Sequence, residues 1–76
     1  MELDLHGKNL YQARTTVRSA LMRTTAADYR LKIIHGYRQG SAIRDMIKEE
    51  FSSHPRVIRI ESSMNPGQTI LVLREY

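Results

Sequence analysis

Two histidines, His6 and His35, each close a short apolar run and precede a glycine and a helix-like segment. If both runs are strands of one parallel pair, the two imidazoles emerge at the same edge of the sheet, where open α/β sheets hold their ligands. The helices that follow direct free N–H groups and positive dipole ends toward that edge, which favours an anion. Together with the carboxylate of Asp4, the pattern predicts a phosphate-handling site.

Phosphodiester cleavage is the chemistry that these groups suggest, because it needs a base, an acid and positive charge on the phosphoryl oxygens. The two imidazoles could divide the acid and base roles, and the helix N-termini at Asn9 and Ser41, with Arg38 or Arg44, could supply the charge. With RNA the 2′-OH can attack without a metal. With DNA water must attack, which favours Mg²⁺ or Mn²⁺ held by Asp4. Both substrates stay open at this stage.

The catalytic candidates, Asp4, His6 and His35, also have a structural interpretation. An isolated histidine at a strand end more often only binds a loop carbonyl, but a matched pair on parallel strands favours a site. Asp4 is either a solvated strand residue or a helix-cap partner, or else it orients His6 or binds a metal ion. The residue pattern weights the two interpretations of Asp4 equally.

Cations, glycines and one aromatic residue around the second histidine are candidates for nucleic-acid binding. Arginine binds phosphate through a planar fork, and a tyrosine can stack on an unpaired base. The alternative is an exposed helix face paired with Asp45 and Glu49, and a tyrosine that packs against the fold. The candidates are Lys8, Gly36, Tyr37, Arg38, Gly40, Arg44 and Lys48.

Sequence periodicity predicts two helices and four strands. Asn9 is a good N-cap and Gln12 completes a capping box, so the first helix is expected over Leu10–Arg23. The second helix begins near Ser41 and ends before His54-Pro55. The strands are expected over residues 2–6, 29–35, 57–61 and 69–74, the last two joined by a turn at Asn65-Pro66-Gly67.

The order β-α-β-α-β-β predicts an α/β two-layer sandwich, that is, a four-stranded mixed sheet with both helices on one face. The first two strands are expected to be parallel and the last to return antiparallel. The opposite face of the sheet would be bare.

Size and composition set the remaining limits. The chain has 76 residues, no cysteine and a net charge of +4, and residues 1–76 are expected to form one domain. Nine of the twelve cations are arginine, which points toward nucleic acid. No apolar stretch approaches the ~20 residues that span a bilayer. A cytoplasmic monomer without a membrane partner is therefore expected.

Two motifs give the chain a family resemblance. Leu3-Asp4-Leu5-His6-Gly7, then Ile34-His35-Gly36-Tyr37-Arg38-Gln39-Gly40 with Ile43-Arg44, are similar to the LDLHG and HGxGxG motifs of the small MutS-related (Smr) domain. The resemblance covers nearly the whole chain. It implies a fold like the C-terminal domain of the third bacterial translation initiation factor. It also implies nucleic-acid binding, with nicking endonuclease activity in some members, in DNA repair, recombination or RNA processing.

One position departs from the family pattern. Arg38 stands where HGxGxG has its middle glycine, and arginine lacks the freedom of glycine to adopt positive φ or to let the backbone approach a phosphate. We therefore expect weak, structure-selective cleavage of DNA or RNA, on branched or single-stranded substrates. The alternative is a non-catalytic nucleic-acid-binding or protein-interaction module.

Overall fold

The chain alternates strands and helices in the predicted order. The computed structural model describes residues 1–36 and 41–75. Its elements are β1 (Glu2–Asp4), α1 (Leu10–Arg23), β2 (Arg30–Ile34), α2 (Ala42–Phe51), β3 (Arg59–Ser62) and β4 (Gln68–Val72). Strand β1 is shorter than predicted because residues 5–8 already form a turn, in which Lys8 N–H donates to the Leu5 carbonyl. Strand β3 starts later than predicted because Val57 N–H donates to the His54 carbonyl.

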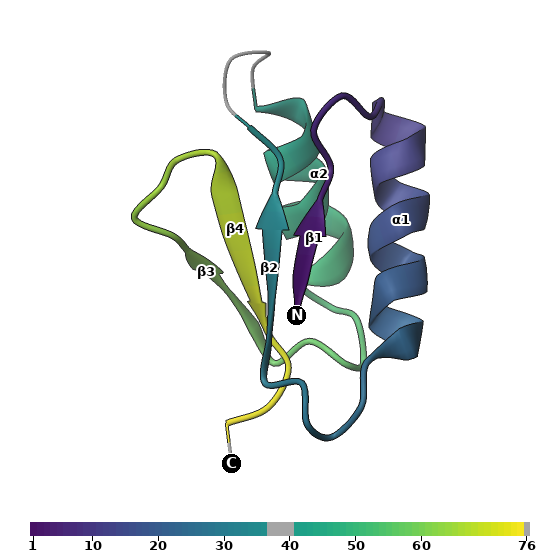
Figure 1. Cartoon of the computed structure of the whole chain (residues 1–76), viewed down its shortest axis with the longest axis vertical. Helices are drawn as coiled ribbons and strands as arrows, with labels where there is room; N and C mark the ends of the chain where they lie inside the picture. The colour runs from purple at the N-terminus through teal and green to yellow at the C-terminus, as the bar shows by residue number, and fades with distance from the viewer. Residues whose placement is uncertain (37–40, 76) are drawn as a thin grey trace.

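The four strands form one mixed sheet in the order β1-β2-β4-β3 (Figure 1). Strands β1 and β2 are parallel, whereas β4 is antiparallel to both of its neighbours, β2 and β3. This confirms the predicted mixed sheet. Strand β4 thus lies between β2 and β3. Its register with β2 brings Thr69 opposite Ile33 and Gln68 opposite Ile34.

Both helices cover one face of the sheet, as predicted. Helix α1 begins at the predicted capping box, in which Asn9 Oδ1 accepts from Gln12 N–H and Gln12 Oε1 accepts from Asn9 N–H. Its far end is held by the Arg56 guanidinium, which donates to the carbonyl and hydroxyl of the C-cap, Thr24. Buried aliphatic and aromatic side chains from both layers fill the core: Leu5, Ala13, Val17, Leu21, Leu31, Ile33, Ile47, Phe51 and Leu71.

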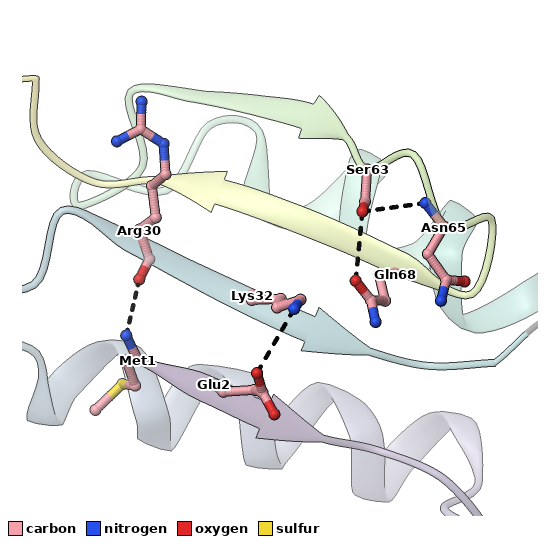
Figure 2. Close-up of polar contacts among 7 residues, drawn as sticks. All are labelled: Met1, Glu2, Arg30, Lys32, Ser63, Asn65 and Gln68. Carbon is pink, nitrogen blue, oxygen red and sulfur yellow. Dashed lines mark hydrogen bonds and ion pairs between the residues drawn. The ribbon is translucent and has the colours of Figure 1, made fainter.

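The other face of the sheet carries ion pairs. The register places Glu2, Lys32, Ile70 and Glu61 in one row across the four strands. Figure 2 shows the Glu2 and Lys32 side chains meeting across β1 and β2, with 3.7 Å between Oε2 and Nζ. At the far edge Arg59 pairs with Glu61 and also with Glu75. No helix covers this face, as predicted, and it carries pairs of opposite charges.

Candidate functional site

The two His-Gly dipeptides lie at the same edge of the sheet, as the repeated pattern predicts. Asp4 of β1 is paired with Ile34 of β2, and Leu5 N–H donates to the Ile34 carbonyl over 2.7 Å. Both strands end there, so His6 and His35 follow neighbouring parallel strands. In Figure 1 this edge holds the β1–α1 turn and the start of α2, with the C-terminus at the opposite end. We call it the rim.

The first His-Gly turn is held by backbone and side-chain hydrogen bonds. Asp4 Oδ1 accepts from His6 N–H over 2.8 Å, and Lys8 N–H closes the turn onto the Leu5 carbonyl over 3.0 Å. Gly7 supplies the positive φ of +80° that the third position of such a turn needs. Asp4 is therefore a hydrogen-bond partner of the His6 backbone.

The imidazole of His6 is exposed. Within residues 1–36 and 41–75 nothing forms a hydrogen bond or ion pair with the His6 ring. Imidazole is the side chain most often used as a general acid or base, and this one is accessible from solvent.

The imidazole of His35 is half-buried and both of its nitrogens are engaged. Nδ1 lies 2.7 Å from the Gly36 carbonyl oxygen and Nε2 lies 2.8 Å from Thr69 Oγ1. A carbonyl oxygen only accepts, so Nδ1 carries the hydrogen. In the neutral ring Nε2 then accepts from the Thr69 hydroxyl, and in the charged ring it donates to it. The contacts of His35 are those of a residue that holds the second turn in place.

Two residues of the rim, Thr69 and Gly67, were not among the residues predicted from the sequence. The Gly67 carbonyl accepts from both His35 N–H and Gly36 N–H, each over 2.9 Å, and Thr69 is only 2% exposed. These contacts tie the β3–β4 hairpin to the second His-Gly turn. A signal was present, because Thr69 is the polar residue that opens the apolar run up to Leu73. What it bonds to depends on strand order.

The N-termini of the two helices differ in their capping. Helix α1 is closed by its capping box. Helix α2 follows Ser41, whose side chain caps no N–H group and instead donates to Asp45 Oδ2 over 2.9 Å. The first turn of a helix has N–H groups without intrahelical partners, so α2 presents donors that its own cap residue leaves unfilled.

Cations flank both turns. Lys8 follows the first turn and forms no ion pair with a described residue. Arg44 lies in the first turn of α2. Its buried Nε is 3.8 Å from Asp45 Oδ1 and has no hydrogen-bond partner in the described part of the chain. Lys48 is exposed one helical turn further on. Gly36 adopts φ +76°, and among the described residues, its chain neighbours aside, none has an atom within 4 Å of the position that a Cβ would take there. Tyr37, Arg38 and Gly40 lie outside the described residues.

Metal binding was suggested through Asp4. In the described ranges, no three His, Asp or Glu side chains are grouped so that they could hold a metal ion together. The carboxylate of Asp4 is, in addition, already an acceptor for His6 N–H. A divalent ion at Asp4 would therefore need water or substrate oxygens for most of its ligands.

Membrane insertion is a separate question. Neither helix of the described residues has the length and apolar character needed to cross a bilayer.

Comparison with known proteins agrees with the fold and the motifs. The model of the Smr domain family matches residues 3–71. The crystal structure of the Smr domain of Thermus thermophilus MutS2 is similar to this chain with a TM-score of 0.87 and 28% sequence identity. The match covers 97% of this chain and 98% of that one. No curated protein sequence matches the chain.

Proposed function

This chain belongs to the Smr domain family, and from that premise we propose that it binds nucleic acid at the rim and cleaves phosphodiester bonds weakly there. The observation that carries the proposal is the pairing of an exposed imidazole, His6, with an uncapped helix N-terminus, that of α2, at one edge of the sheet. The first can move a proton and the second can hold a phosphate.

Phosphate binding at the rim draws on α2 and on two cations. The unfilled N–H groups of the first turn and the dipole of α2 attract an anion. Arg44 adds a guanidinium whose Nε lies 3.8 Å from Asp45 Oδ1 without a hydrogen bond, and Lys8 adds an ammonium from the first turn. Asp45 opposes this attraction in part, but its carboxylate is engaged by the Ser41 hydroxyl. Arg38, Tyr37, Gly36, Gly40 and Lys48 remain proposed contacts of the same ligand.

Proton transfer falls to His6 in this proposal, with Asp4 and His35 as positioning residues. With RNA, the 2′-OH attacks the adjacent phosphorus and gives its proton to the His6 ring. The P–O5′ bond breaks, and the leaving oxygen takes a proton from water. This route uses only groups of the chain and of the substrate. Asp4 holds the backbone of His6, and His35 holds the turn that leads into α2.

A non-catalytic binding module is the second candidate, and one observation favours it. Both ring nitrogens of His35 are engaged by Gly36 and Thr69, so only one of the two expected acid–base groups is free. The loss of one partner would lower a cleavage rate without affecting phosphate binding.

A substrate panel separates the two candidates. Labelled RNA and DNA, each as single strand, duplex and branched form, are incubated with the purified chain in Mg²⁺, in Mn²⁺ and in chelator. Cleavage products from at least one substrate support the nuclease. Binding without cleavage under every condition favours the binding module, and no binding to any substrate overturns both.

Salt titration locates the binding surface. Lys8→Ala and Arg44→Ala should each reduce affinity for all sequences and lower the salt slope by about one, because each removes a phosphate contact. Lys32→Ala is the matched control, since Lys32 lies on the sheet face that no helix covers, away from the rim, and is paired with Glu2. Equal losses in all three variants would mean that only net charge matters and that the rim is not the site.

A further inference from the structure

Helix α1 has an exposed outer face that takes no part in the proposed site at the rim. The helix buries Ala13, Val17, Ala20 and Leu21, so positions on its other side face solvent. Its exposed residues include Tyr11, Thr15, Arg18 and Met22, spaced by four, three and four residues, which places them in one stripe along the helix. Tyr11 and Met22 are each 72% exposed. We call these four residues the α1 stripe.

The charge of α1 has one sign. Its sequence, Leu10–Arg23, contains three arginines and no acidic residue. Arg14 is neutralised by Glu50 of α2, with 2.5 Å between Nε and Oε2. Arg18 and Arg23 form no ion pair with any residue in the described ranges. On the open sheet face Lys32 is paired with Glu2 (Figure 2), and Arg59 is paired with Glu61. No described acidic residue pairs in this way with Arg18 or Arg23 on the outer side of α1.

The α1 stripe begins at the rim. Helix α1 starts directly after the turn that carries His6 and Lys8, and from there it runs toward the opposite end of the molecule (Figure 1). At a rise of about 1.5 Å per residue, Arg18 lies about 10 Å along the axis from Tyr11, and Met22 about 16 Å. The first distance corresponds to about three nucleotides of a stacked strand.

We propose that the outer face of α1 binds a single-stranded nucleic-acid segment that leaves the rim; this rests on the proposed function. Tyr11, Arg18 and Met22 place an aromatic ring, a guanidinium and an apolar side chain one after another along the helix. Bases can stack on the ring and a phosphate can pair with the guanidinium. The ring of Tyr11 stacks on the first unpaired base, Arg18 contacts a phosphate further along, and Met22 contacts a base or sugar. A strand with unpaired bases fits, because stacking on Tyr11 needs an open base face.

The experiment compares a short and a long single strand on the intact chain. Fluorescence anisotropy measures the affinity for labelled oligonucleotides of about four and about twelve nucleotides, lengths within the usual range of single-strand sites. Tyr11→Ala should weaken binding of the longer strand by roughly fivefold to a hundredfold, the cost of one lost stacking contact. Arg18→Ala should lower its salt slope by about 0.7. Binding of the shorter strand, which the rim alone can hold, should change less than about twofold in either variant.

Matched controls come from the opposite end of the molecule. Tyr29 is 42% exposed and Arg30 is exposed on the open face, so Tyr29→Ala and Arg30→Ala remove the same groups elsewhere. Both should leave the two affinities unchanged. Every substituted side chain is at the surface, so all four variants should fold like wild type. Urea unfolding checks this.

Three results would overturn the inference. If Tyr11→Ala and Arg18→Ala bind the longer strand like wild type, α1 is not part of the site and its stripe is left for a protein partner. If they weaken both strands equally, no separate strand path exists. In either case losses in Lys8→Ala and Arg44→Ala would still uphold the rim. If wild type binds neither strand, both the rim and the α1 stripe fail.

Discussion

In the first His-Gly turn the backbone is hydrogen-bonded and the His6 imidazole has no partner among the described residues. In the second, the His35 imidazole is hydrogen-bonded, and the helix that follows has no side-chain cap from Ser41. Asp4, the β-turn and the capping box of α1 occupy the polar groups around His6. The Gly36 carbonyl and Thr69 occupy the ring of His35, while Ser41 leaves the N-terminus of α2 uncapped. In the proposed function, one short sequence pattern would thus supply a proton carrier at one place and an anion-binding helix end at the other.

The largest expected effect breaks the equivalence of the two histidines in catalysis. His6→Ala should lower the cleavage rate by about 10²–10⁴-fold, the usual worth of an acid–base group. Affinity should be nearly unchanged, because proton transfer acts on the transition state. Single-turnover cleavage and equilibrium binding measure the two. A cleavage rate that survives in His6→Ala would assign proton transfer to another group.

The next effect separates the histidines by stability. His35→Ala should lower the free energy of unfolding by about 1–3 kcal/mol, because it leaves the buried Thr69 hydroxyl without its partner. His6→Ala should change it by less than about 0.5 kcal/mol, since its ring is exposed. Urea denaturation gives both values.

A double-mutant cycle isolates the contact. Thr69→Val should be destabilising on its own and nearly neutral in the His35→Ala background, since the hydroxyl then has no ring to bind. Additive losses would show that His35 acts through packing and not through Thr69.

The glycines test what the two turns share. Gly7 and Gly36 adopt φ of +80° and +76°, and apart from their chain neighbours no residue that the structure describes has an atom within 4 Å of the position that a Cβ would take at either. Gly7→Ala and Gly36→Ala should therefore each cost about 1–2 kcal/mol from backbone conformation alone. Thermal or urea unfolding checks this. A much larger loss in one variant would reveal a contact specific to that turn.

The smallest expected effect concerns the helix caps. Asn9→Ala should cost about 1 kcal/mol, because it removes the acceptor for Gln12 N–H. Ser41→Ala should cost only a few tenths of that, since the Ser41 hydroxyl bonds to Asp45 and not to the helix backbone. Equal costs in urea unfolding would mean that Ser41 caps α2 after all, which would remove the contrast between the two helix ends.

Much of the molecule was predictable from local sequence signals. The capping residues Asn9 and Gln12 and the spacing of Val17 and Leu21 set α1 at its observed bounds, Leu10–Arg23. Alternation in Leu3-Asp4-Leu5 placed Asp4 on the exposed side and Leu5 in the core. Strand ends were less accurate, because the turns after Asp4 and before Arg59 depend on hydrogen bonds that periodicity does not report.

The sequence by itself determined the element order, because capping and periodicity are local signals. It also determined the parallel β1–β2 pair and the presence of both histidines at one edge, because a strand-helix-strand crossover makes its two strands parallel. Only the tertiary structure decided what each histidine does. Strand β4 inserts between β2 and β3, and this brings Thr69 and the Gly67 carbonyl against the second turn. Pairing between strands more than thirty residues apart (Ile33 and Thr69) has no short-range signal. The difference between His6 and His35 was therefore invisible until the sheet was assembled.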